Sequence, residues 1–414
     1  MSPFVIAAVW VGLGFVAAAL PRQRYARLVA IVPLAGAVLT LIAARSMSPA
    51  VPLGGLSAIT GLDRAGQGLL VATGISMAFV VALQPAIDAS IGRAIGVVGA
   101  AATLAMASGD PLVTAVVLTA AAGTLALRWI AQAPGRVTLA AGRVAGSGTA
   151  ALIAASPFLP LTGFTTGVRP VVVAALLVAG VASLLAVYPF GGWAAGLLGS
   201  VRPLEVAPWL VLLVPVVLLL AERIPGSVLG DGVPLFEHVL LVIGLGSAAW
   251  GGYWAVRGSA RARYGRIFMA DVALCVAAVG GARVSPAVSG ALIILLTHLT
   301  VAPLLLRAGD AELAWPRRVA WALLSGIPPS PSFWGRFLIL EALAAGNIGS
   351  TVAAVFAMTA IFIATVIAAS TRTVAAPRRR WQTRVPEVAA WLLVAVGIAI
   401  GLAPQSASGF VFGS

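Results

Sequence analysis

The sequence predicts an all-α membrane protein with about fourteen transmembrane helices, and three observations support that prediction. Hydrophobic residues make up 61% of the 414 residues and charged residues only 9%, whereas soluble domains have about 45–50% and about 25%. The hydrophobic residues lie in runs long enough to cross a bilayer, which takes about 20 apolar residues. All 26 basic residues are arginines, and most of them lie in the short segments between these runs.

The apolar runs, divided at charged residues and at proline and glycine, give fourteen predicted spans. The first span has no basic region before it, and Arg22 and Arg24 follow it. We therefore expect a transmembrane helix there and not a cleaved signal peptide. The predicted ranges are 3–20, 28–44, 66–86, 94–108, 111–127, 145–162, 170–189, 207–221, 239–255, 267–282, 285–306, 319–346, 350–370 and 388–404.

The distribution of arginine predicts the orientation in the membrane. Twenty of the 26 arginines fall in the odd-numbered loops and five in the even-numbered loops. Cytoplasmic loops carry the excess of basic residues, so the pattern predicts a multi-pass protein of the inner (plasma) membrane with both termini outside. Loops such as 374–387, which holds Arg378–Arg380, are also candidates for contact with anionic lipid or with a soluble partner.

Composition argues against several other classes of site. The net charge of +14 comes with no basic cluster interleaved with aromatic residues, so nucleic-acid binding is not expected. Cys275 is the single cysteine, and His238 and His298 lie far apart in sequence. No disulfide, metal site, cofactor site or catalytic residue is expected from this pattern.

Two predicted spans contain helix-breaking residues. The seventh ends with Pro189 and Gly191, and the twelfth contains Pro328, Pro329 and Pro331. Proline removes a helix hydrogen-bond donor, and the carbonyls that it frees inside a membrane must be satisfied by protein or water. Interruptions five spans apart indicate an internal repeat with broken helices along a transport path, and ordinary proline kinks are the alternative.

Four stretches around these breaks resemble known motifs. Residues 326–337 (GIPPSPSFWGRF) are similar to GlPPlxGFxxKF, which is moderately specific, whereas the other three are weak singly and stronger together. These three are residues 290–298 with 307–309, similar to lltHxxxKxxLFlxaG; residues 180–193, similar to GflfKxxxxPFHxW; and residues 251–271, similar to GnlxAlxqxxxKRxLAYSSIxHxG.

These motifs are those of the proton-antiporter family of membrane subunits, which the chain resembles over about residues 110–345. The family includes antiporter-like subunits of respiratory complex I (NADH-quinone oxidoreductase), of Mrp antiporters and of energy-converting hydrogenases. The resemblance implies an antiporter-like fold with two inverted five-helix repeats and broken helices 7 and 12. It also implies a division of the single membrane domain 1–414 into N-terminal helices (1–108), first repeat (109–255), second repeat (256–370), and last loop with final helix (371–414).

The proton-carrying residues of the family are largely absent from this chain. The lysine of the seventh span falls on Leu184 and the histidine of the PFH motif on Gly191. The carboxylate partner of that lysine falls near Thr119 or Ala120, in a segment without acidic residues. Burial shifts the pKa of a lysine toward neutrality, which lets it exchange protons, and leucine has no such chemistry.

The second half keeps one relay residue, His298. The lysine of the twelfth span is replaced by Arg336, the AYSSIxH histidine by Asp271, and a lysine that some members carry on the eleventh span by Ala302. Arginine stays charged at any accessible pH, so Arg336 is predicted to be a fixed charge that binds freed carbonyls and a carboxylate, either Asp271 or Glu341.

Asp271, His298, Arg336 and Glu341 are therefore the candidate proton-path or structural polar residues, because charges inside a membrane are costly. Each has a simpler interpretation. Asp271 is close enough in sequence to pair with Arg266 at the interface, and His298 could hydrogen-bond between helices. Glu341 could be hydrated at the outer end of its helix, and Arg336 is expected to act as a strut.

The resemblance and the losses together predict a membrane-arm subunit of a complex I-related redox or ion-translocating complex, degenerate in proton pumping and largely structural. Its expected partners are other membrane subunits, a soluble redox or catalytic arm, and lipids. It is not expected to be catalytic alone, although it could belong to a quinone oxidoreductase- or hydrogenase-type complex. The alternative is an active proton or cation transporter with a rewired polar path, energising a hydrogenase-like or inorganic-carbon-uptake partner.

Overall fold

The computed structural model describes residues 2–19, 26–46, 62–85, 87–108, 110–156, 168–223, 229–258, 260–281, 285–307, 313–370 and 384–404. Helices account for all the regular structure in these ranges, and no strand occurs among them. Eight described helices are long and apolar enough to cross a membrane, and several shorter apolar helices accompany them. The predicted all-α membrane fold is confirmed.

The helices of the first part of the chain follow the predicted spans closely. Their bounds are α1 Pro3–Ala19, α2 Ile31–Ser46 (after the 3₁₀ turn Ala26–Ala30), α3 Arg64–Ala82, α4 Ile91–Ala107, α5 Pro111–Gln132, α6 Arg136–Ala155, α7 Val168–Leu184, α8 Gly192–Ser200, α9 Pro203–Ala207, the π-helical segment η3 Pro208–Leu213, and α10 Val214–Glu222.

The later helices are longer on average, and the same correspondence holds. Their bounds are α12 Val233–Arg257 (after the 3₁₀ turn Gly230–Gly232), α13 Ala260–Gly281, α14 Ser285–Leu305, α15 Ala314–Ser325, α16 Pro331–Ala344, α17 Ile348–Ser370 and α18 Arg384–Leu402. Each predicted range overlaps one helix or one run of consecutive helices. The number of membrane crossings, fourteen, remains a prediction.

Several helices begin well before the predicted apolar run. α6 starts at Arg136 where the prediction was 145, and α13 starts at Ala260 where the prediction was 267. The extra turns carry arginines, including Arg136 and Arg143 in α6. Hydropathy locates only the hydrocarbon-embedded part of a helix, whereas a long arginine side chain lets the helix continue into the headgroup region.

Both predicted helix breaks are present. α7 ends at Leu184, and a non-helical segment leads to α8 at Gly192. α15 ends at Ser325, and α16 begins at Pro331, where a proline at the first helical position needs no hydrogen-bond acceptor. The breaks leave the last carbonyls of α7 and α15 without partners in their own helices.

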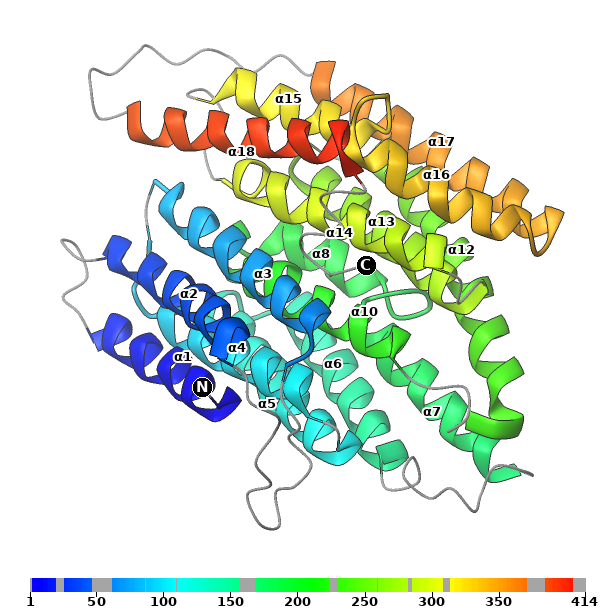
Figure 1. The fold of residues 1–414 in the computed structure, drawn as a ribbon, viewed down its shortest axis with the longest axis horizontal. Helices are drawn as coiled ribbons and strands as arrows, with labels where there is room; N and C mark the ends of the chain where they lie inside the picture. Colours follow the sequence, from blue (N-terminus) through cyan, green and yellow to red (C-terminus); the bar gives the residue numbers. More distant parts are fainter. Residues whose placement is uncertain are drawn as a thin grey trace.

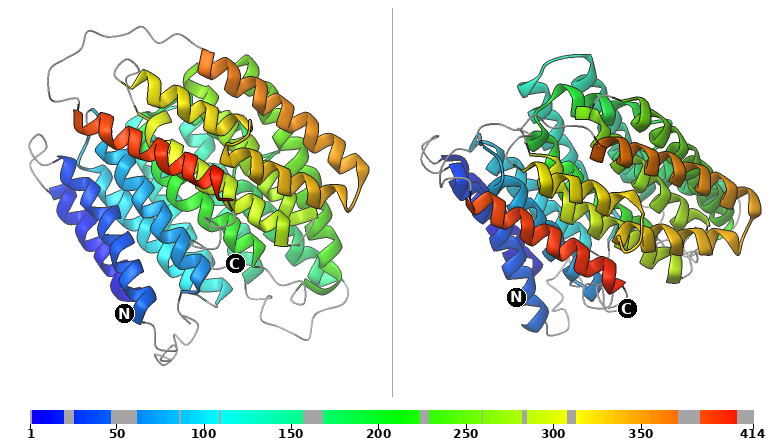
Figure 2. Two further views of the ribbon diagram at one scale, coloured as in Figure 1. Left: turned by 45° about the horizontal axis from the view of Figure 1, so that its top comes forward. Right: turned by 90° about the horizontal axis from the view of Figure 1, so that it is seen from above.

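The helices form one bundle (Figure 1). α1 to α4 gather at one edge, where α1 packs closely on α4 through Gly14 and Gly96. α16 and α17 lie at the opposite edge, and α18 lies along α14, α15 and α16 (Figure 2). α13 and α14 are mostly buried in the bundle, so polar side chains on them are shielded from lipid.

Candidate functional site

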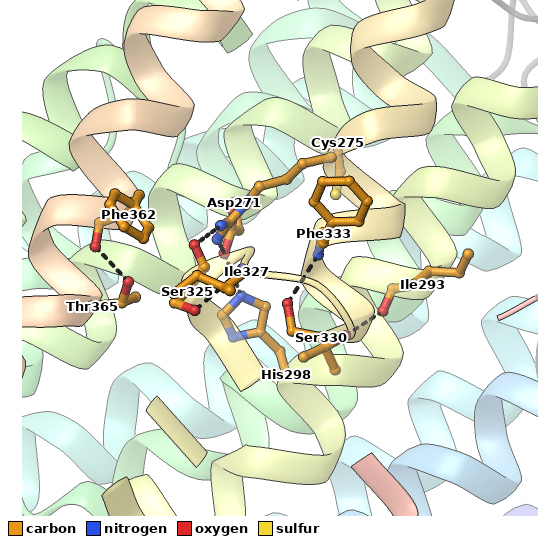
Figure 3. Close-up of polar contacts among 12 residues, drawn as sticks. Asp271, Cys275, Ile293, His298, Ser325, Ile327, Ser330, Phe333, Phe362 and Thr365 are labelled. Carbon is orange, nitrogen blue, oxygen red and sulfur yellow. Dashed lines mark hydrogen bonds and ion pairs between the residues drawn. The ribbon is translucent and has the colours of Figure 1, made fainter. Parts of the chain in front are cut away.

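Three buried ionisable side chains from three helices meet beside the second broken helix. The Arg336 guanidinium, on α16, donates to both carboxylate oxygens of Asp271, on α13, with Nε to Oδ1 at 3.1 Å and Nη2 to Oδ2 at 2.9 Å. His298 Nε2, on α14, lies 3.0 Å from Asp271 Oδ2 (Figure 3). Asp271 is fully buried, and His298 and Arg336 are 1% and 5% exposed. We call Asp271, His298 and Arg336 the buried triad.

The helix break supplies a third acceptor to the arginine. Arg336 Nη1 donates to the carbonyl of Ser325, the last residue of α15, at 3.1 Å. Arginine has five donors in a planar fork. Here one edge of the guanidinium donates to a carboxylate, and another edge donates to a freed carbonyl. A compact lysine ammonium cannot reproduce this geometry.

Gly326 makes the approach between the break and Arg336 feasible. Its φ is +80°, a left-handed backbone conformation that residues other than glycine rarely adopt. A Cβ atom added at this position would lie 2.7 Å from Arg336 Nη1. The glycine that ends α15 is therefore needed both for its backbone angle and for the space that it leaves to the guanidinium.

Gly326→Ala is expected to destabilise the protein by about 1–3 kcal/mol, since it imposes backbone strain and displaces Arg336 from the Ser325 carbonyl. The thermal unfolding midpoint in detergent measures the effect. Gly346→Ala is the control, because the nearest atom to a Cβ there is the Leu343 carbonyl oxygen at 3.6 Å. Equal midpoints for the two variants would contradict the role given to Gly326.

Arg336 and Asp271 neutralise each other, and the pair is bidentate, which is the strong form of this interaction. The histidine contacts the pair on one side only. Among the described residues, His298 Nδ1 and Tyr264 Oη are buried without a hydrogen-bond partner. The ring centroids of Phe268 and Tyr264 lie 5.0 and 6.0 Å from that of the imidazole, so two aromatic rings, one with a hydroxyl, lie beside His298.

A proline and a serine fix the position of His298 on α14. Pro303 lies inside that helix and has no N–H for the carbonyl of Leu299 four residues before it. The hydroxyl of Ser76, on α3, donates to this Leu299 carbonyl at 2.5 Å. The bond links α3 to α14 one residue beyond His298, which keeps the imidazole in register with Asp271.

The structure leaves Glu341 outside the buried triad. Glu341 is exposed on α16, and of the two carboxylates considered for Arg336, Asp271 is the one that pairs with it. The alternative pairing of Asp271 with Arg266 is wrong. Arg266 donates to the Trp254 carbonyl at 2.7 Å and lies over the Trp254 ring, because its side chain extends toward the C-terminal end of α12.

The surroundings of the first helix break are apolar. Leu184, at the position where the motif resemblance predicts a lysine, is 1% exposed and lies beside the mutually tilted rings of Trp129, Trp193 and Trp209, whose neighbouring centroids are 5.8 and 4.9 Å apart. The cavity among them measures about 10 Å³, near the lower limit for one water molecule. Trp209 Nε1 donates to the Leu184 carbonyl at 3.0 Å.

The two breaks therefore satisfy equivalent carbonyls with different chemistry. Leu184 and Ser325 are each the last residue of the helix before a break. The Leu184 carbonyl accepts a hydrogen bond from a neutral indole, and the Ser325 carbonyl accepts one from a charged guanidinium. A tryptophan therefore lies at the first break, and an ion-paired arginine lies at the second.

A second buried ion pair was missed by the sequence analysis. Arg128, at the end of α5, forms a bidentate pair with Glu205 of α9 and also donates to Ser90 Oγ at 3.1 Å. Trp129 Nε1 donates to the Glu205 carbonyl at 2.9 Å. Glu205 is 2% exposed. Both charges fall in predicted loops, and no local pattern indicates a pairing over 77 residues.

A third pair lies near the start of α3, where Arg223 Nη2 donates to the two Asp63 carboxylate oxygens at 2.5 and 2.6 Å. Asp63 also caps α3 by accepting from Gly66 N. Within the described ranges, no group of three or more histidine, cysteine, aspartate or glutamate residues is arranged to hold a metal ion.

Comparison with solved structures places the chain in the antiporter-like fold. A chain of the Mrp complex from Dietzia sp. DQ12-45-1b has a TM-score of 0.82 at 16% identity; the match covers 100% of this chain and 52% of that one. A chain of the archaeal membrane-bound sulfane sulfur reductase has a TM-score of 0.78 at 15% identity, covering 98% and 96%. A chain of respiratory complex I from Thermus thermophilus has a TM-score of 0.81 at 15% identity, covering 99% and 97%.

This chain thus spans about half of the matched Mrp chain and nearly the whole of the other two. No protein-family model and no curated protein matches its sequence. At these identities the matches establish the fold. The antiporter-like membrane-subunit fold that the motifs predicted is confirmed.

Proposed function

We propose that this chain is an antiporter-like membrane-arm subunit of a complex I-related multisubunit redox or ion-translocating complex, with a degenerate proton path and a largely structural role. The three matched structures are of multisubunit membrane complexes, which supports other membrane subunits as partners. A soluble redox or catalytic arm and bound lipids complete the proposed assembly. Within the chain, residues 109–255 and 256–370 are the proposed inverted repeats.

One observation supports the degenerate path above all others. At the position of the family's lysine, Leu184 is buried beside three tryptophans, so no group there can bind a proton. In the second half the only arginine of the site is neutralised by Asp271 and stays charged at any accessible pH. A proton moving through both halves would meet the apolar side chains around Leu184 and then the ion pair of Arg336 and Asp271.

The purified chain in liposomes is therefore expected to show no proton or sodium antiport above that of empty vesicles. A pH-sensitive dye inside the vesicles measures the decay of an imposed pH gradient. A decay with wild type that His298→Ala abolishes would contradict the structural role. It would favour the second candidate, an active transporter.

That second candidate, a rewired proton or cation path that energises a hydrogenase-like or inorganic-carbon-uptake partner, is favoured by the free edge of His298. The buried Nδ1 of His298 and the buried hydroxyl of Tyr264 have no partner among the described residues, and buried polar atoms normally bind protein or ordered water. Water along this edge would give the histidine a proton pathway. The liposome experiment distinguishes the two candidates.

The proposed location is the inner (plasma) membrane, with both termini outside. The charge argument partly rests on Arg22, Arg24 and Arg378–Arg380, which lie outside the described residues, as does the C-terminal Ser414. In a Cys275→Ala background, we expect Ser2→Cys to react with an impermeant thiol reagent from the outside only. Labelling of Ser2→Cys from the cytoplasmic side alone would contradict the orientation.

A further inference from the structure

A groove of about 630 Å³ runs along one open side of the bundle, between the N-terminal helices and α18. Its two walls come from α2 and α3 on one side and from α18 on the other, and its floor comes from α14, which contacts both α3 and α18. Leu41, Ile75, Leu392 and Val396 on these walls are 40–55% exposed. The groove is therefore open to the surroundings of the bundle.

The polarity of the groove is confined to one end. Arg64, the first residue of α3, lies at that end and is exposed. It forms no ion pair or hydrogen bond within the described part of the chain, whereas the neighbouring Arg223 is paired with Asp63. Arg64 is the one charged side chain among the described residues that line the groove, and it marks this end.

The rest of the groove is apolar. Its two hydroxyl groups are already used, since Ser76 donates to the Leu299 carbonyl and Thr300 to the Leu296 carbonyl. The Gln67 amide at the charged end donates to the Leu62 carbonyl at 2.8 Å. A ligand that fits this surface is apolar over most of its length and negatively charged at one end.

The dimensions match a lipid chain. The α3 wall runs from Arg64 to Phe79, and these fifteen residues of helix span about 22 Å. The hydrocarbon core of one leaflet is about 15 Å thick, and the headgroup layer adds to that thickness. A single charged side chain at one end of an otherwise apolar surface fits a lipid, whose charged headgroup is followed by a long acyl chain.

From this placement we infer that the groove is a binding site for an anionic phospholipid, with the phosphate on Arg64 and an acyl chain lying between α3 and α18 down to Phe79 and Thr300. The lipid seals the gap between the N-terminal helices and α18. Cationic side chains at a membrane surface attract anionic headgroups, and the buried acyl chain supplies the apolar contact.

Lipid retention in the purified protein tests this inference. The chain is extracted in mild detergent together with any subunits that co-purify, and bound lipids are counted by native mass spectrometry while phosphatidylglycerol or phosphatidylcholine is added. We expect wild type to bind phosphatidylglycerol more tightly than phosphatidylcholine. Arg64→Gln should weaken phosphatidylglycerol binding about five-fold and weaken phosphatidylcholine binding less, because the choline ammonium offsets the charge of its phosphate.

Two variants fill the groove from opposite walls. Val396→Trp on α18 and Ala72→Trp on α3 should each abolish the retained lipid. The matched controls are Val116→Trp, which lies on an exposed face of α5 outside the groove, and Arg136→Gln, which removes another exposed arginine. Both controls should retain lipid as wild type does.

Three outcomes would overturn the inference. They are unchanged lipid retention in both filled variants, equal phosphatidylglycerol affinity in Arg64→Gln and wild type, and loss of a co-purifying protein subunit in place of a lipid. The last outcome would assign the groove to a helix of a partner. Because Arg64 is exposed and its variant is expected to fold, the charge test stands even if a filled variant misfolds.

Discussion

Arg336→Leu is expected to reduce sharply the yield of folded, assembled protein. Removal of the guanidinium leaves the Asp271 carboxylate fully buried with only His298 beside it and leaves the Ser325 carbonyl without its donor. Breaking a buried ion pair from one side costs about 3–5 kcal/mol, a large part of the stability of a typical domain. Size-exclusion chromatography and thermal unfolding in detergent measure the loss.

Two control variants separate charge from packing. Arg336→Lys keeps the positive charge but not the planar fork, so it should assemble better than Arg336→Leu without new proton conductance in liposomes. The double variant Asp271→Leu/Arg336→Leu removes both charges and should recover much of the loss, since well-packed apolar residues often replace a buried pair at little cost. Equal yields of Arg336→Leu and wild type would contradict the structural role given to Arg336.

Glu205→Gln is expected to have the second largest effect. Glu205 and Arg128 are 3% and 12% exposed at their side chains, and the carboxylate holds two nitrogens of Arg128. Loss of the negative charge leaves Arg128 partly buried and unpaired, which should destabilise the protein by about 3 kcal/mol or more. The thermal midpoint of the purified variant measures the change.

Asp63→Asn is the matched control. The Asp63–Arg223 pair also links two distant helices, but its side chains are 57% and 26% exposed. Solvent screens such pairs, which typically contribute less than about 1 kcal/mol, and asparagine keeps the α3 cap at Gly66. Similar losses of stability in Glu205→Gln and Asp63→Asn would show that burial does not determine how much these ion pairs contribute to the stability of the protein.

The sequence by itself determined the class of protein, the placement of the helices and the two breaks. These features are local, because hydropathy over about 20 residues reports a membrane helix and proline or glycine interrupts one wherever it occurs. The absence of lysine is equally readable from the residues, and the motif resemblance alone indicates that Leu184 stands where a lysine is expected. Helix ends were less accurate, since arginine-bearing turns extend beyond the apolar core.

Only the tertiary structure decided which charges meet. Asp271 and Arg336 are 65 residues apart, Arg128 and Glu205 are 77 apart, and Ser76 reaches a carbonyl 223 residues away. No local pattern encodes such pairings, because the packing of the whole bundle decides which surfaces of two helices come into contact. The sequence named Arg336 and two possible carboxylates. The packing of α13 against α16 selected Asp271, and the exposed position of Glu341 excluded the other.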